Sequence, residues 1–229
     1  MAFRSEAAII AGLMVCAAQA GTPVPLRHRH LRGGAAGVLT VTEDGIRFDE
    51  PGKHRDHSRR WSFAEIQQLT IAEETLRILT YEDEAVKFGR DRRFVFDELP
   101  EGLATELYPL FSKRLDQRFV AALAADAGKP SWTIAAKLLR GARGSQGEIA
   151  VSAGCVVYRT ASPEESRTWR IGDIDAVSSS GPFDLTITTF EDAGRDFHFQ
   201  LKRALAEREY ESLWRAVNRS KGLEIVSHE

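Results

Sequence analysis

The sequence predicts an α+β protein made of two tandem copies of one unit, each an antiparallel, curled sheet closed by a C-terminal helix. The first observation is an internal repeat, in which six blocks recur in the same order, 103 to 110 positions apart. Residues 61–66 and 169–174, which both begin with Trp and end with Ile, form one such pair. The second observation is that apolar and polar residues alternate over short segments between turn residues, as in half-buried strands. The third is an apolar stripe at helical spacing at the end of each copy, which can cover the open end of a curled sheet.

Residues 1–20 are expected to be a secretory signal peptide rather than part of the fold. Arg4 provides a short positive start, residues 7–18 are uncharged and mostly apolar, and Ala18-Gln19-Ala20 has the small residues of a cleavage site. The apolar run is shorter than the roughly 20 residues that span a bilayer, although an uncleaved anchor is the alternative. The sequence therefore predicts an exported protein, periplasmic or secreted, with cleavage near Ala20. Cys155 is then the one cysteine of the mature chain, and its apolar neighbours predict a buried, inert thiol.

The first repeat is expected over residues 21–118. Asp44-Gly45 lies between two alternating segments and predicts a hairpin, because this dipeptide favours the tight turns that join antiparallel strands. Further strands are expected over residues 68–71, 76–81 and 93–97.

An amphipathic helix is expected to close the first repeat, beginning near Pro100, because proline suits a first helical position. Its apolar stripe is Leu103, Leu107, Leu110, Phe111 and Leu115, and Pro109 is expected to kink the helix or to mark its true start.

The alanine-rich residues 119–127 can extend this helix, so residues 119–135 are expected to form a helical linker. The second repeat is expected over residues 136–222, and residues 223–229 form a C-terminal tail. The matching helical stripe of the second repeat is Tyr210, Leu213, Trp214 and Val217.

The meander with Trp-x-x-x-x-Ile at the third strand, followed by a terminal helix that carries aromatic residues, resembles a pleckstrin-homology-like unit of the bacterial, GRAM-like kind. The resemblance covers nearly the whole mature chain twice. It implies two tandem pleckstrin-homology-like units, each a curled sheet or partial barrel closed by its C-terminal helix, and it implies a binding module. Lipid-binding members resemble one another in a long basic loop between the first two strands. The corresponding residues 42–45 and 152–154 are short, which argues against phosphoinositide binding.

Composition and charge exclude several classes of protein. Hydrophobic residues make up 43% of the 229 residues and charged residues 28%, as in globular proteins and unlike disordered or collagen-like chains. The formal net charge is −2, and each half carries −1, whereas dedicated nucleic-acid binders are basic. We therefore expect no nucleic-acid partner.

The sequence contains no nucleotide-binding, nucleophile-elbow, HExxH or CxxC motif. The glycine-rich residues 141–147 predict a flexible loop, and the alternative is an anion site formed with Lys137, Arg140 and Arg143. The paired acids Glu164-Glu165 and Asp173/Asp175 are expected at the solvated surface. Trp61 and Trp169, which occupy equivalent positions of the two copies, are expected in the core.

A histidine cluster in the first copy provides the candidate metal ligands, His28, His30 and His57. His28 and His30 are two positions apart, so on a strand both side chains point to one face. A loop that brings His57 toward them would give three nitrogen ligands, which suit zinc. The alternative is a set of hydrogen-bonded structural histidines, since Ala136 and Leu138 occupy the equivalent positions of the second copy.

These observations favour a non-catalytic, exported binding or scaffold protein without a cofactor, whose tandem modules bind a protein or peptide partner. One alternative is a lipid or membrane-surface binding module. The second alternative is a metal-dependent enzyme that uses the histidine cluster of the first copy.

Overall fold

The computed structural model describes residues 21, 23–30, 33–51, 58–84, 89–116, 118–126, 128–141, 143–162, 164–191 and 194–223. The predicted signal peptide, residues 1–20, and residues 224–229 of the predicted tail lie outside these ranges. No helix within them is long and apolar enough to cross a membrane.

The described chain has the same order of elements twice. Each half has four strands, a short 3-10 turn, three strands and an α-helix, and one additional strand lies between the halves. The first half comprises β1 (Pro23–His30), β2 (Gly33–Val41), β3 (Gly45–Asp49), β4 (Arg59–Ser62), η1 (Phe63–Glu65), β5 (Ile66–Ala72), β6 (Thr75–Asp83), β7 (Asp91–Asp97) and α1 (Leu103–Arg114). The additional strand is β8 (Arg118–Ala122). The second half comprises β9 (Trp132–Arg140), β10 (Arg143–Val151), β11 (Cys155–Thr160), β12 (Arg167–Arg170), η2 (Ile171–Asp173), β13 (Ile174–Ser178), β14 (Asp184–Thr189), β15 (Arg195–Leu201) and α2 (Glu207–Ser220).

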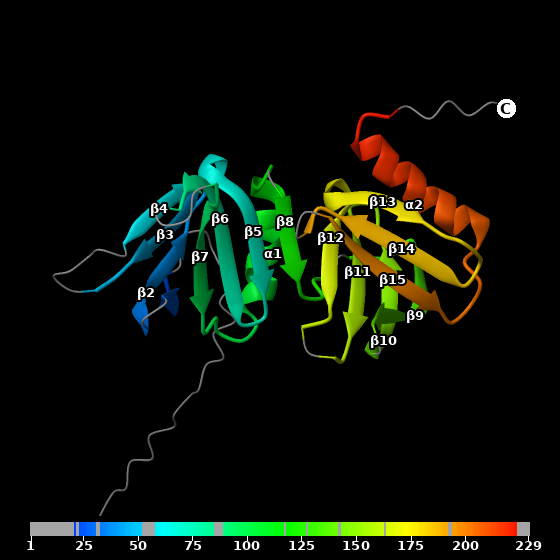
Figure 1. Ribbon diagram of the computed structural model, residues 1–229, viewed down its shortest axis with the longest axis horizontal. Helices are drawn as coiled ribbons and strands as arrows, with labels where there is room; N and C mark the ends of the chain where they lie inside the picture. The colour runs from blue at the N-terminus through cyan, green and yellow to red at the C-terminus, as the bar shows by residue number, and fades with distance from the viewer. Residues whose placement is uncertain are drawn as a thin grey trace, which may run out of the picture.

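The fifteen described strands form one continuous mixed sheet, in the order β13-β14-β15-β9-β10-β11-β12-β8-β5-β6-β7-β1-β2-β3-β4 (Figure 1). The predicted architecture, two separate antiparallel units each closed by its own helix, is therefore wrong. The fold is a single, sheet-rich body. The two halves share one sheet because β8 pairs with a strand of each half.

β8 occupies part of the predicted helical linker and joins the two halves. It pairs in parallel with β5, from Gln68 opposite Arg118 to Ala72 opposite Ala122, and its other edge pairs antiparallel with β12. Phe119, Val120 and Ala121 are all buried. A strand covered on both faces has a continuous apolar sequence instead of an alternating one, and this explains why the segment resembles a helix in sequence.

The strand and hairpin predictions for the first copy are confirmed. The Asp44-Gly45 turn joins β2 to β3, and the segments expected over residues 68–71, 76–81 and 93–97 lie within β5, β6 and β7. A Cβ atom at Gly45 would fall 2.0 Å from the carbonyl oxygen of Trp61, so glycine permits the close approach of β3 and β4.

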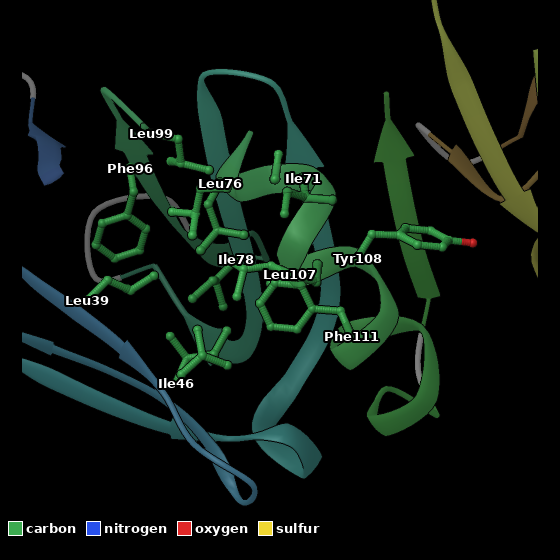
Figure 2. Packing of buried hydrophobic residues seen from close by; sticks show 14 of the residues in the cluster. Leu39, Ile46, Ile71, Leu76, Ile78, Phe96, Leu99, Leu107, Tyr108 and Phe111 are labelled. Carbon is green, nitrogen blue, oxygen red and sulfur yellow. The ribbon is translucent and has the colours of Figure 1, made fainter. Parts of the chain in front are cut away.

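Two hydrophobic clusters line the sheet, one in each half. In the first, Leu107 and Phe111 of α1 point toward Ile78 of the sheet, while Tyr108 points away from them (Figure 2). Trp61 and Trp169 are only 2% and 1% exposed, which confirms their prediction as core residues. Each indole packs edge-on against a phenylalanine, Phe94 at 4.7 Å and Phe197 at 4.8 Å between ring centroids.

The two helices differ from their predicted stripes in detail. α1 begins at Leu103, after Gly102 with a left-handed φ of 81°, and Pro109 lies inside the helix. In α2, Leu213 and Val217 are buried as expected, but Trp214 is 37% exposed and is not a core residue.

The helix α2 lies against β13, the last strand at one end of the sheet (Figure 1). The hydroxyl of Tyr210 donates a hydrogen bond to the main-chain oxygen of Val177 at 3.3 Å. The ammonium group of Lys221, directly after α2, donates to the main-chain oxygen of Asp175. The corresponding strand of the first half, β5, pairs instead with β8.

Candidate functional site

The two halves are fixed to each other by buried hydrogen bonds around β8 and β12. Thr168 is 1% exposed, and its hydroxyl donates to the oxygen of Leu123 at 2.8 Å and accepts from the amide of Ala125 at 2.9 Å. The guanidinium of Arg170 donates to both carboxylate oxygens of Asp173 and to the oxygen of Leu115, which follows α1. The seam between the halves is therefore a specific, hydrogen-bonded junction.

Tyr108 of α1 completes the junction near Cys155 of the second half. Burial, and secondarily the neighbouring Cys155, raise the pKa of the Tyr108 phenol to about 12. Cys155 is a free cysteine and is buried, as predicted, while its inertness stays a prediction.

Two adjoining hollows lie along the seam and share Thr75, Arg77 and Glu164. The smaller one, here called the arginine hollow, has a volume of about 310 Å³. Its charged lining residues are Arg77, Arg140, Glu164, Glu165, Arg167, Glu191 and Arg195. The larger one, here called the acidic hollow, has a volume of about 1070 Å³. Its acidic lining residues are Glu73, Glu74, Asp97, Glu98, Glu101 and Glu164. Together they form the seam groove, whose two ends carry opposite charge.

A network of ion pairs forms the wall of the arginine hollow. The buried carboxylate of Glu191 lies 3.7 Å from Arg167 and 3.9 Å from Arg195, and it accepts a hydrogen bond from the indole Nε1 of Trp169 at 3.0 Å. Arg140 donates to Glu165 at 2.8 Å. Arg167 and Arg195 also lie 5.9 and 4.9 Å from the centre of the Phe197 ring, within cation–π range.

Arg167 is the most deeply buried arginine of this network. Its side chain is 10% exposed. Desolvation has the largest effect and lowers the pKa of its guanidinium, whereas the attraction of Glu191 raises this pKa. Two of its hydrogen bonds go to main-chain oxygens, of Glu164 at 2.6 Å and of Ser166 at 2.8 Å. Its buried Nε makes no hydrogen bond within the described residues.

Side chains behind the hollow hold Glu165 in place. The hydroxyl of Ser145 donates to Glu165 at 3.1 Å, and the phenol of Tyr158 donates to the main-chain oxygen of Ser145 at 2.7 Å. Ser145 and Tyr158 are both buried. These hydrogen bonds thus fix the position of the Glu165 carboxylate in the wall.

The acidic hollow has a different character. Arg29 forms a two-pronged pair with Asp97, at 2.5 and 2.9 Å, which neutralises that carboxylate. Glu73, Glu74, Glu98 and Glu101 are exposed, and they leave a negative field at this end of the groove.

Of the three predicted metal ligands, the structure describes the side chain of His28 alone. His28 lies on β1, 6% exposed, with ring centroids 5.0 to 5.8 Å from those of Phe48, Phe94 and Phe96. His57 and the side chain of His30 lie outside the described residues. Within the described part of the chain, no group of three or more His, Cys, Asp or Glu residues could hold a metal ion. The three-histidine site remains a prediction.

Two other predictions need correction, and one alternative stays open. The glycine-rich residues 141–147 are not a loop throughout, because β10 begins at Arg143 and pairs with β9. Of the residues of the alternative anion site, Arg140 lines the arginine hollow and Lys137 and Arg143 do not, and the anion site stays an untested alternative. Asp173 is buried rather than solvated, since Arg170 pairs with it.

Arg167, Glu191 and Arg195 are not among the site residues predicted from the sequence. The repeat contained a usable signal, because Arg59, Glu82 and Arg92 occupy the equivalent positions of the first copy. Arg92 pairs with Glu82 at 3.4 Å and lies 5.1 Å from the centre of the Phe94 ring, as Arg195 does with Glu191 and Phe197.

No protein-family model matches this chain, and no curated protein matches it. Among solved structures, the chain is similar to the C-terminal domain of an unknown protein from Leishmania infantum, with 9% identity over 39% of this chain and 84% of that one and a TM-score of 0.32. It is also similar to the DH/PH domains of p115-RhoGEF, with 7% identity over 43% and 32% of the two chains and a TM-score of 0.30. The Spt16D Pob3N heterodimer matches with 8% identity over 68% of this chain and 75% of that one, with a TM-score of 0.29.

None of these three structures is described as a bacterial GRAM-like protein. Likeness at such TM-scores carries no argument about the function or the site of this chain.

Proposed function

We propose that this protein is a non-catalytic binding protein that holds a peptide segment of a partner protein in the seam groove. The observation that carries the proposal is the opposite charge of the two adjoining hollows, which share Thr75, Arg77 and Glu164. A peptide that places an acidic group in the arginine hollow and a basic group in the acidic hollow is complementary to both ends. Such complementarity increases the specificity of binding and the rate of association.

The rigidity of the seam supports this proposal. The groove is formed by strands of both halves, and the Thr168 and Arg170 hydrogen bonds fix their relative position. A preformed groove costs little conformational entropy on binding, so a modest contact area suffices for affinity. The volumes of the hollows, about 310 and 1070 Å³, lie near the two ends of the range of about 300–1,000 Å³ that is typical of ligand pockets.

A peptide-display selection on the immobilised protein tests the proposal. We expect the selected peptides to carry acidic and basic residues at separate positions, and we expect their binding to weaken as salt screens the charges. Binding of a selected, fluorescently labelled peptide is then measured by anisotropy.

The informative variant is Arg77→Glu, because Arg77 is exposed and lines both hollows. The matched control is Arg92→Glu, since Arg92 is a strand arginine of the first half that lines neither hollow. We expect Arg77→Glu to weaken binding and Arg92→Glu to leave it unchanged. Failure to select any peptide, or equal effects of both variants, would contradict the proposal.

A further inference from the structure

We infer that β4, the terminal strand at one end of the sheet, is a second binding site, at which an extended segment of a partner protein that carries an acidic side chain adds as a further strand. This site is separate from the seam groove, because no residue of β4 lines either hollow. The inference does not depend on the proposed function. It rests on the internal repeat, in which the strand equivalent to β4 already accepts an added strand.

The two ends of the sheet carry the same two kinds of edge that meet at the seam. Inside the molecule, β8 pairs with β5 on one side and with β12 on the other. The equivalent strands of the other half, β13 and β4, are the two terminal strands of the described sheet (Figure 1). Tyr210 and Lys221 occupy two carbonyls of β13, whereas no described strand pairs with the outer edge of β4.

β12 shows what such an edge needs in order to receive a strand. It is only four residues long, yet it pairs antiparallel with β8, with Thr168 opposite Ala121. The carboxylate of Asp173, in the 3-10 turn that follows, accepts a hydrogen bond from the main-chain amide of Phe119 in β8 at 3.4 Å. A short strand followed by a carboxylate is therefore sufficient in this fold.

β4 and the turn after it reproduce this arrangement in the first half. β4 also has four residues, and it pairs with β3 in the register in which β12 pairs with β11. Glu65 of η1 occupies the repeat position of Asp173. Both hydrogen bonds that Ser62 donates to this carboxylate go to one oxygen, Oε2, at 2.7 Å. Its other oxygen, Oε1, can accept an N–H of an added strand.

The charge of this edge favours an acidic partner. Arg60 is exposed and forms no ion pair with another described residue. It lies directly opposite Arg47 of β3, which pairs instead with Asp49. An acidic side chain of the added strand, in the place that Ala121 takes opposite Thr168, would meet Arg60, and such opposite-charge pairs between neighbouring strands are stabilising.

A second copy of this chain does not meet these requirements. Pairing of two β4 edges would bring Arg59 and Arg60 of both copies together, and like charges in opposite positions destabilise a strand pair. The β13 edge of a second copy already carries the hydrogen bonds of Tyr210 and Lys221. Charged side chains at an edge also discourage the addition of apolar strands. The occupant is therefore an acidic segment of a different protein.

Three acetylated and amidated peptides with the sequence of residues 118–126, which include β8, serve as probes. The acidic peptide carries Ala121→Glu, and the basic peptide carries Ala121→Lys. The third is the acidic peptide with N-methyl groups at positions 120 and 121, which remove one N–H from each edge of the strand. Hydrogen–deuterium exchange of the full chain, read by mass spectrometry, detects the addition because an added strand protects main-chain amides of β4.

We expect the acidic peptide to slow exchange in β4 but not in β13, the basic peptide to protect less, and the N-methylated peptide not to protect. Arg60→Glu should weaken binding of the acidic peptide about threefold or more and should reverse the preference between the acidic and basic peptides. This variant should remain folded, because Arg60 is exposed. The matched control is Arg77→Glu, an exposed strand arginine of the same half that lines the seam groove, and it should leave the protection of β4 unchanged.

The inference is overturned if the acidic peptide leaves exchange in β4 unchanged, if the N-methylated peptide protects equally, or if Arg60→Glu does not alter the preference. Changes confined to β8 and β12 would place the peptide in the seam and would also overturn it. A concentration-dependent mass in sedimentation, with β4 protected in the protein alone, would assign this edge to a second copy instead. Protection of β4 without any display-selected peptide that depends on Arg77 would refute only the proposed function.

Discussion

Replacing Thr168 with valine should weaken the junction between the two halves. The side chain is 1% exposed, and its hydroxyl bonds both to the oxygen of Leu123 and to the amide of Ala125. Valine has nearly the same shape, so the substitution opens no cavity. It leaves one buried carbonyl and one buried amide without a partner.

The magnitude follows from these two groups. Each buried polar group left unpaired costs about 1–3 kcal/mol. The additional buried methyl group returns about 1 kcal/mol. We therefore expect Thr168→Val to lower the free energy of unfolding by about 1–5 kcal/mol.

Urea unfolding followed by circular dichroism measures this change, provided that the slope of the transition is the same in both proteins. The matched control is Thr189→Val. Thr189 is equally buried, but the hydrogen bonds of its hydroxyl to described residues are long, at 3.3 and 3.4 Å. The control should therefore cost less than Thr168→Val. A loss below about 1 kcal/mol for Thr168→Val, or a loss no larger than that of the control, would refute the reasoning.

Two further predictions concern buried aromatic residues. Trp169→Ala should cost about 3–5 kcal/mol in unfolding free energy, the range for large-to-small aromatic truncation, and a cost below about 1 kcal/mol in thermal or urea unfolding would contradict its place in the core. Tyr108 has a pKa of about 12 in the folded state against an ordinary value of 10.0, so the folded state binds more protons between these values and stability should fall as pH rises through this window. The loss should reach about 2–3 kcal/mol, and Tyr108→Phe should remove it; a pH profile unchanged by that substitution would show that Tyr108 does not cause the loss.

The local structure of the first copy was predictable because it depends on neighbours in sequence. Asp44-Gly45 marks a turn, and alternation marks the strands on either side of it. The joining of the two halves into one sheet was not predictable in this way. Phe119, Val120 and Ala121 form a short apolar run, which is equally compatible with a buried helix and with a buried strand. Pairing with β5 and β12 selects the strand, and these partners lie about 50 residues away on either side.

The candidate site was harder to predict than the fold. The sequence indicates Arg140 as an anion ligand only together with its neighbours in sequence, Lys137 and Arg143. The structure instead brings Arg140 together with Arg167 and Arg195, from two other strands. Isolated arginines in a sequence with balanced charge give no signal of such a cluster. The aligned repeat, which sets Arg195 opposite Arg92, was the one available indication.

The hydrogen bonds from Tyr210 and Lys221 to β13 affect whether a further strand can pair with this edge of the sheet. A terminal strand with unpaired carbonyls is a template on which another chain can add, and proteins that expose one tend to form fibres. At β13, two of these carbonyls already accept hydrogen bonds from the protein's own side chains. In the first half, the equivalent edge accepts β8 and thereby recruits the second half. The same edge thus propagates the sheet in one copy and terminates it in the next, so this end of the molecule resists both the addition of a third copy and open-ended polymerisation.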